Sequence, residues 1–382
     1  MKTLQFIKKV TLAASIFCIW MPVAIMAKGN GTQRNPFQVN SATLLAKVGS
    51  GTDGWTLSAH YKQTANIDIG GINNWTPIGT EATPFTGTYD GDGKTISNLK
   101  INDSGNDNKG LFGYINGVVK NVRMNTVVIT GKNRIGGVAG QIIGGTVQNC
   151  YVVNINIEGN DIVGGVAGGN SGNGNIINCY ATGRIIGNST IGGLVGVNAA
   201  TVQNCYAVVN ISGGDVGGVV GQNNGTLQNC YATGNAEGSW AGGVAGGNSG
   251  TLQFCYTTGG VDGTWAGGGV AGRNMGGTIS NCVALNYKVH GNFGGRVIES
   301  GRGTLSNNYA RESGMTIGVD LTPSDASGIH GEDATAANTH GGNSGTWWSS
   351  TAGFSSTLWS FSNGRLPWLR GFEGITQNPE VK

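Results

Sequence analysis

Charged residues are scarce in this chain, since only 11% of its 382 residues are Asp, Glu, Lys or Arg. Lys and Arg together number 23 and Asp and Glu 20, and three of the lysines precede residue 28. Removing that stretch leaves 20 basic and 20 acidic residues. Nucleic-acid binding depends on clustered positive charge. Because no basic cluster is present, we expect no nucleic-acid partner.

Side chains that typically bind metals are also sparse and scattered. Only four histidines occur, and they lie apart in the sequence: His60, His290, His330 and His340. No H-E-x-x-H motif is present, which excludes a zinc peptidase on motif grounds. The stretch Asp90–Lys94 (DGDGK) resembles the start of a calcium loop, but Ile101 occupies the position of the bidentate Glu. We therefore expect neither a metal nor a cofactor.

Long apolar runs are absent except at the N-terminus. Three lysines, the apolar stretch Val10–Ala24 and a plausible cleavage site at Ile25-Met26-Ala27 predict a cleaved signal peptide, residues 1–27. The alternative is a permanent membrane anchor, but the run is short and Pro22 interrupts it. With no second run of about 18 apolar residues, we expect no transmembrane span after removal of the signal, and a secreted or cell-surface location.

Glycine is abundant instead, with 71 residues, and the sequence around it repeats. Segments such as GGVAGGN are each followed by one cysteine, and successive cysteines are 29, 26, 25, 25 and 27 residues apart. Leu99, Val122 and Asn308 extend the pattern, which gives about nine units over residues 90–310. The cysteines are Cys150, Cys179, Cys205, Cys230, Cys255 and Cys282.

Each unit contains short alternating segments, such as TVQNCYVV and DIVGGVAG, separated by Gly, Asn and Ser. This pattern is typical of strands and turns. Three short strands with turns fill about 25 residues, one coil of a parallel β-helix. We predict an all-β, right-handed parallel β-helix of about nine coils with N- and C-terminal caps.

Equivalent residues of successive coils should stack in columns. Gly-Gly pairs would let the backbone bend or adopt positive φ. The apolar residues after them should fill the interior: Val138, Val166, Leu194, Val219, Val244 and Val270. The Asn before each cysteine could pass amide hydrogen bonds from coil to coil. Stacked cysteines have parallel Cβ vectors, which favours reduced, packed thiols over the alternative of three disulfides.

These units resemble the GLUG-motif family, whose signature is closest at GLFG (Gly110–Gly113) and GGLVG (Gly192–Gly196). The resemblance covers most of the chain after residue 27. That family occurs in bacterial secreted and surface proteins, including adhesin-like proteins and accessory regions of immunoglobulin A peptidases. It implies a bacterial extracellular interaction role by analogy. The motif brings no catalytic residues with it.

The two ends differ from the repeats. Residues 28–89 should form an N-terminal cap and the first strands, with a short helix over 41–48 capped by Asn40 or Ser41. Residues 311–382 begin as a polar connection and end in a cluster rich in Trp and Phe. We favour a C-terminal cap that covers the last coil. The alternative is an aromatic binding surface.

Binding candidates are aromatic. Trp240 and Trp265 are one repeat apart, and two interpretations are open: an exposed pair that binds a sugar or protein, or an inward substitution at core positions. The residue after each cysteine should point outward as a tyrosine stripe that stabilises the coils and could also bind ligand: Tyr180, Tyr206, Tyr231 and Tyr256, with Tyr151 and Tyr309. Glu237 and Asp262 could stack as a weak cation site or as solvated turn residues.

These features predict a non-enzymatic, adhesin-like protein that presents a β-helix face to a glycan or protein ligand. One alternative is a polysaccharide lyase or hydrolase, which would need carboxylates and bases converging on one face. Another is a structural spacer within a surface assembly. The sequence identifies no catalytic residue.

Overall fold

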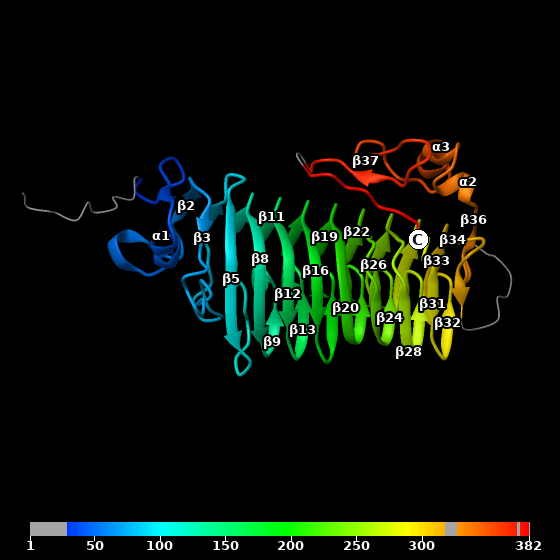
Figure 1. The fold of residues 1–382 in the computed structure, drawn as a ribbon, viewed down its shortest axis with the longest axis horizontal. Coiled ribbons are helices and arrows are strands. Elements are labelled where there is room, and N and C mark those ends of the chain that lie inside the picture. Colours follow the sequence, from blue (N-terminus) through cyan, green and yellow to red (C-terminus); the bar gives the residue numbers. More distant parts are fainter. Residues whose placement is uncertain (1–28, 318–326, 373–374, 382) are drawn as a thin grey trace, which may run out of the picture.

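The computed structural model describes residues 29–317, 327–372 and 375–381. The chain winds into an elongated rod whose strands lie across its long axis (Figure 1). Two large parallel sheets of 17 and 19 strands form its sides. The predicted all-β parallel β-helix is therefore confirmed, whereas its right-handed winding stays a prediction. The predicted signal peptide, residues 1–27, lies outside the described residues.

The first sheet contains β1 (Phe37–Val39), β2 (His60–Gln63), β4 (Thr88–Asp90), β6 (Phe112–Ile115), β7 (Val118–Lys120), β10 (Ala139–Ile143), β11 (Thr146–Gln148), β14 (Ala167–Ser171), β15 (Asn175–Ile177), β18 (Val195–Asn198), β19 (Thr201–Gln203), β21 (Val220–Asn223), β22 (Thr226–Gln228), β25 (Ala245–Asn248), β26 (Thr251–Gln253), β29 (Ala271–Ser280) and β33 (Gly301–Ser306).

The second sheet contains β3 (Ile67–Asp68), β5 (Thr95–Asp103), β8 (Arg123–Gly131), β9 (Asn133–Ile135), β12 (Tyr151–Glu158), β13 (Asp161–Gly164), β16 (Tyr180–Ile186), β17 (Thr190–Gly192), β20 (Tyr206–Gly217), β23 (Tyr231–Ala232), β24 (Ala236–Gly242), β27 (Tyr256–Thr257), β28 (Val261–Gly268), β30 (Val283–Ala284), β31 (Lys288–His290), β32 (Phe293–Gly295), β34 (Tyr309–Arg311), β35 (Thr316–Ile317) and β36 (Glu332–Ala334).

Helices are short and lie near the ends. The predicted N-terminal helix is α1 (Ala42–Lys47), and the Ser41 side chain caps it by accepting a hydrogen bond from the Leu44 amide. Near the C-terminus, α2 (Ala336–Thr339) and α3 (Ser344–Thr346) precede a π-helical turn at Trp347–Thr351 and the antiparallel pair β37 (Trp359–Ser360) and β38 (Trp368–Leu369).

The rod has about eleven coils rather than nine. A continuous ladder of parallel strands runs β1-β2-β4-β7-β11-β15-β19-β22-β26-β29-β33. Its first members lie before residue 90, where the Gly-Cys pattern has not begun. There, large rings such as Phe37, Tyr61 and Phe85 fill the interior instead. The count from the sequence was low because it followed only the signature of the middle coils.

Alike residues stack in register, as expected. Val147, Ile176, Val202 and Leu227 pair across successive coils and are fully buried. The six apolar residues that follow the Gly-Gly pairs are also fully buried. The glycine pairs, however, do not adopt positive φ. That conformation belongs to the residue before each cysteine, which is Asn in five coils, for example Asn149 at 53°, and Phe254 in the sixth. The pairs are needed because neighbouring backbones approach closely: a Cβ at Gly218 would lie 2.1 Å from the carbonyl oxygen of Gly243.

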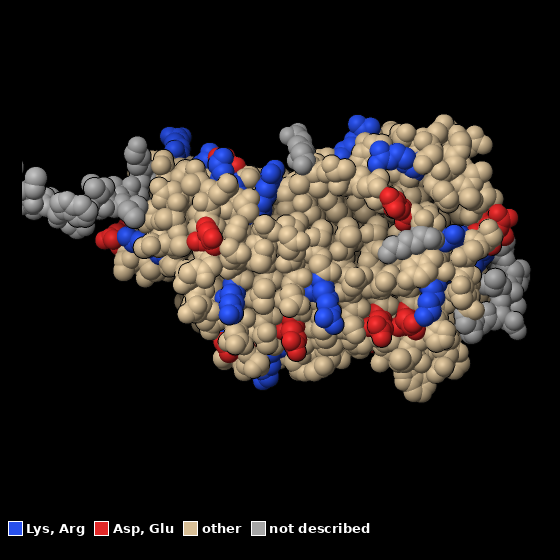
Figure 2. Space-filling view, in the orientation of Figure 1, with Lys and Arg blue, Asp and Glu red and all other residues tan. Residues whose placement is uncertain are grey.

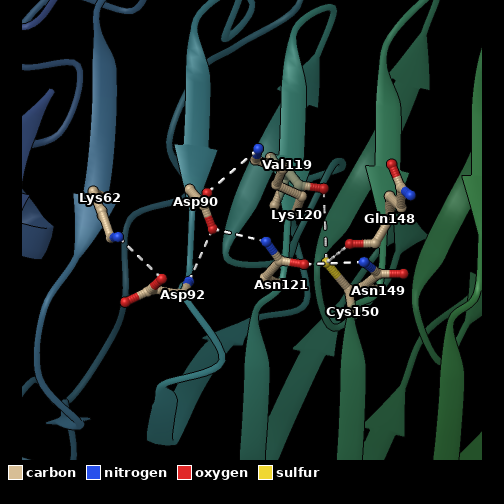
Figure 3. A network of polar contacts seen from close by, with 9 residues as sticks. All are labelled: Lys62, Asp90, Asp92, Val119, Lys120, Asn121, Gln148, Asn149 and Cys150. Atoms are coloured by element: carbon tan, nitrogen blue, oxygen red, sulfur yellow. Dashed lines mark hydrogen bonds and ion pairs between the residues drawn. The ribbon is translucent and has the colours of Figure 1, made fainter. Parts of the chain in front are cut away.

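The cysteines form a buried ladder of free thiols. Each thiol donates to the carbonyl two residues earlier, as Cys150 does to Gln148 at 3.3 Å (Figure 3). Burial raises the pKa of the Cys150 thiol well above its ordinary value, which keeps it protonated and able to donate. The structure thus agrees with the favoured interpretation of packed, reduced thiols.

A second asparagine ladder lies inside the coils and was not singled out from the sequence. It occupies the last position of the GGVAGGN-like segments: Asn170, Asn198, Asn223, Asn248 and Asn274. Each side-chain amide donates to the next, at 2.8–3.0 Å. The same amides also reach backbone carbonyls, as Asn223 does to Gly225 O in the turn before β22, at 3.3 Å, and to Thr251 O on the next coil, at 3.1 Å. This ladder pairs polar backbone groups that water cannot reach.

Replacing Asn223 with leucine should lower the free energy of unfolding by more than about 2 kcal/mol. Asn223 donates to Asn248 and accepts from Asn198, so the substitution leaves buried polar groups on both neighbouring coils without partners. Urea unfolding followed by circular dichroism measures the loss. The exposed neighbour Asn224 provides the control, Asn224→Leu. Equal midpoints for the two variants would show that the ladder contributes nothing.

Candidate ligand-binding surface

The predicted tyrosine column exists as a stack of rings outside the coil interior. Tyr180, Tyr206, Tyr231 and Tyr256 follow one another with centroids 4.7–4.9 Å apart and planes within 7° of parallel. Tyr151 precedes them at 4.7 Å and 26°. The strands that carry them pair in register, which fixes this spacing. Offset-stacked rings contribute about 0.5–1.5 kcal/mol per pair beyond area burial.

The C-terminal segment (residues 336–372 and 375–381) covers this column. It runs back along the side of the rod and then returns (Figure 1). Trp359 packs on Tyr231 and Tyr256, and Phe372 lies 5.0 Å from Tyr206 between ring centroids. Tyr231 is only 1% exposed and Tyr256 is fully buried. The tyrosines thus point away from the coil interior as predicted, but all six are buried, because the aromatic C-terminal segment packs on the apolar surface of the ring stack. The suggestion that the stripe could also bind ligand is therefore not supported.

The same observation corrects the predicted position of the aromatic cluster. It was expected over the last coil, but it packs on the flank of much earlier coils. Phe372 contacts Tyr151, 221 residues earlier (372 − 151), and the hydrogen bond from Tyr231 Oη to Gln377 Oε1 at 2.9 Å spans 146 residues. Tyr256 Oη donates to the Pro367 carbonyl at 2.7 Å. These bonds satisfy the phenols that the segment buries.

The asparagines before the cysteines have two uses along the rod. In the early coils Asn178 donates to Asn149, Asn149 to Asn121, and Asn121 to Asp90, at 2.9–3.2 Å (Figure 3). This is the predicted coil-to-coil amide ladder. Further on, Asn229 accepts the indole N–H of Trp359 at 3.3 Å, and Asn281 donates to the Ala352 carbonyl at 3.2 Å. There the column anchors the C-terminal segment.

Trp240 is half-buried and held by a cation. The guanidinium carbon of Arg273 lies 4.8 Å from the indole centroid, and Arg273 also forms an ion pair with Asp215. Asp215 is the register partner of Trp240 on the preceding coil. Burial raises the pKa of the Asp215 carboxyl, although the positive charge of Arg273 opposes the shift. Asp215 thus neutralises the charge of Arg273, and Arg273 packs on the Trp240 indole and orients it.

Trp265 is 59% exposed, so the inward interpretation is wrong for this residue. The interior position is taken by Ala266, which pairs with Trp240. A register shift between Gly238 and Trp240 causes this offset. The third glycine of Gly267–Gly269 adds one residue to the coil, so the two indoles are not stacked directly as the repeat spacing had suggested.

Phe293, on β32, is a neighbouring exposed ring that the sequence analysis missed. It pairs with Ala266 on β28 and is 57% exposed. It lies directly before a Gly-Gly pair, where other coils have buried Ile or Val, such as Ile191 and Val216, so the sequence pattern gave no sign of its exposure. Trp240, Trp265 and Phe293 lie on three successive coils, and we call them the aromatic edge.

Some of the acidic residues form ion pairs with cations, among them Asp90, Asp215 and Asp262. Glu237 and Asp262 are register partners, as predicted. Asp262, however, forms ion pairs with Lys288 and His290, and the hydrogen bond from Lys288 holds its pKa below the usual value. Among the described residues no group of three or more His, Cys, Asp or Glu could hold a metal ion. On the face drawn in Figure 2, charged residues are scattered, with no continuous basic patch.

Comparisons with known proteins agree with the repeat architecture. The family model described as "The GLUG motif" matches residues 159–186, 187–212, 212–237 and 263–289. The chain therefore carries four GLUG motifs, which confirms the resemblance noted in the sequence.

Two relatives are similar over part of the chain. "Halomucin" of Haloquadratum walsbyi is 38% identical over 29% of this chain and 1% of its own length. A "Putative Gly-rich membrane protein" of Evansella cellulosilytica is 32% identical over 32% of this chain and 16% of its own length. The chain thus spans a small part of each relative. A solved structure titled "putative immunoglobulin A1 protease" from Bacteroides ovatus aligns with 90% of this chain and 94% of its own, at 22% identity and a TM-score of 0.49.

Within the residues that the structure describes, no helix combines the length and apolar character required to cross a membrane.

Proposed function

We propose that this chain is a non-enzymatic, exported cell-surface protein that binds a glycan through the aromatic edge. The observation that carries the proposal is the exposure of Trp265 and Phe293 on adjacent coils. Large rings exposed together on a soluble surface typically mark an interaction site. The surface location rests on the predicted signal peptide, and the names of the two partial relatives, a mucin-like name and a membrane protein, are compatible with it.

The chemistry of the edge favours a neutral sugar. An indole face packs against the apolar C–H face of a pyranose ring while the hydroxyls stay in water. Arg273 is already paired with Asp215, so no free cation is available there to attract an acidic group. Because Arg273 also fixes the Trp240 indole, little conformational entropy is lost when a ligand packs on it.

A polysaccharide lyase or hydrolase is the rival function. Such enzymes need carboxylates that are free to transfer protons or to bind the substrate. Here Asp90, Asp215 and Asp262 are each within ion-pair distance of Lys or Arg. A structural spacer is the third candidate, and it would leave the exposed rings without a role. Turnover assays on a polysaccharide panel separate the first rival from binding, since depolymerisation would contradict our proposal.

Replacing Trp265 with alanine should weaken binding to a neutral glycan at least tenfold, because aromatic anchors often account for 2 kcal/mol or more of binding energy. A glycan array identifies the ligand, and titration calorimetry measures the affinity of both proteins. Ile143→Ala, which removes another exposed apolar side chain on a distant coil, serves as the control. Unchanged affinity in the Trp265 variant would reject the aromatic edge as the site, and absence of any glycan ligand would favour the spacer.

A further inference from the structure

A polar cleft lies where the C-terminal segment stops covering the tyrosine column. It encloses about 380 Å³, within the roughly 300–1,000 Å³ typical of ligand sites. Its lining comprises Gly93, Asn121, Arg123, Gln148, Asn149, Tyr151, Asn178 and Gly371. A second hollow of about 340 Å³ shares Arg123 and Tyr151 with it and extends the cleft towards Tyr180. Among the residues that the structure describes, the lining of both parts contains no acidic residue.

Arg123 is the charged group of this cleft, and it forms no ion pair with any residue that the structure describes. Its guanidinium carbon lies 5.8 Å from the Tyr151 ring centroid, and its buried Nε has no hydrogen-bond partner in the described chain. Nearby lysines differ, because Lys62 pairs with Asp92 and Lys120 with Asp90 (Figure 3). Burial raises the pKa of Tyr151 to about 12, so the phenol is neutral at physiological pH and cannot balance Arg123.

Gln148 supplies a free amide beside this cation. In the same column of later coils, Gln253 donates to Gln228 and Gln228 to Gln203, each at 2.8 Å. The register partners of Gln148 are instead Lys120 and Ile177, so the Gln ladder does not reach it. Its side chain forms no hydrogen bond within the part of the chain that the structure describes, and it faces the cleft.

We propose that this cleft binds an acidic saccharide, with its carboxylate on Arg123 and its hydroxyls on the Gln148 amide. Tyr151, which is 7% exposed and packs against Tyr180 and Arg123, forms part of the wall. A guanidinium beside a carboxylate forms charge-assisted, bidentate hydrogen bonds. The side-chain amide of Gln148 can both donate and accept hydrogen bonds, so it suits the hydroxyl groups of a sugar. This site is separate from the aromatic edge and differs from it in the charge of its ligand.

The test is titration calorimetry of the purified protein with trigalacturonate and with its methyl ester, which has the same rings without the charge. We expect binding of the acid and at least tenfold weaker binding of the ester. Arg123→Gln should reduce affinity for the acid at least tenfold. Gln148→Glu, which keeps the shape but adds a negative charge, should abolish binding without lowering the melting temperature. Arg302→Gln, at an exposed position on β33, should change nothing.

Several outcomes would overturn the proposal. These are equal affinity for acid and ester, full affinity in the Gln148→Glu variant, and tighter binding of triglutamate than of trigalacturonate. The proposal would also be rejected if the wild-type protein bound neither trigalacturonate nor a sulfated disaccharide. If Arg123→Gln does not fold, Gln148→Glu decides. Trp265→Ala should leave this affinity unchanged, so failure here is distinguishable from failure of the aromatic edge.

Discussion

Alanine at Gly218 should destabilise the protein by about 3 kcal/mol or more. A Cβ at this position would lie 2.1 Å from the carbonyl oxygen of Gly243 on the next coil and 2.7 Å from the Cβ of Ala232. The oxygen belongs to backbone, and Gly218 itself donates to the Gly242 carbonyl at 3.1 Å, so neither strand can shift without breaking the ladder. Ordinary overpacking of a core costs about 1–3 kcal/mol, and here rigid backbone is on one side of the clash.

The matched control is Gly71→Ala. Gly71 has no heavy atom within 4 Å of a built Cβ, and its φ is not in the left-handed region. Its substitution should change stability by no more than about 0.5–1 kcal/mol, since only the entropy of the unfolded chain is altered. Denaturant unfolding followed by circular dichroism compares the two. A shared midpoint would show that the coils can separate locally to accept a methyl group.

Trp359→Ala should release the C-terminal segment from the tyrosine column while the coils stay folded. Trp359 is fully buried, and its ring centroid lies 5.7 Å from that of Tyr256 and 5.1 Å from that of Phe354. Its indole N–H also donates to Asn229. Replacing a buried Trp by Ala costs about 3–5 kcal/mol. Backbone hydrogen bonds of continuous parallel ladders join the coils, whereas side chains hold the C-terminal segment. The substitution should therefore destabilise the packing of the C-terminal segment and leave the coils folded.

Limited proteolysis with mass spectrometry and amide hydrogen exchange measure this release. We expect cleavage within residues 336–372 and faster exchange there, with unchanged protection of β16 and β20. Trp265→Ala, the substitution of an exposed indole, controls for loss of a tryptophan as such. Protection of the segment at the wild-type level would contradict the idea that the ring stack holds it.

Several features of the candidate sites were predictable from local sequence. Trp265 was singled out by its spacing from Trp240, and exposure agrees with the outward interpretation. The tyrosine stack followed from the residue after each cysteine. The one-residue offset at Trp265 could not be predicted from the sequence. Three successive glycines allow two alignments of this coil with the preceding one, and only the observed pairing of Gly242 with Gly268 selects one of them.

The acidic-saccharide cleft could not have been found in this way. Its residues are ordinary members of the columns, and what distinguishes Gln148 is the identity of its neighbours one coil away, Lys120 and Ile177. Its wall at Gly371 comes from a distant part of the chain. No motif in the sequence joins these positions.

The sequence by itself determined the coil, its parallel register, and the buried columns of apolar residues and cysteines. Because the spacing repeats, each residue lies beside the equivalent residue of the next coil. The repeat in the sequence therefore predicts which side chains stack. Only the tertiary structure decided which outward residues reach solvent. The C-terminal segment packs on coils more than 100 residues earlier, as the bond from Tyr256 to Pro367 across 111 residues shows. Such a contact has no period in the sequence, because it depends on matching apolar surfaces in space.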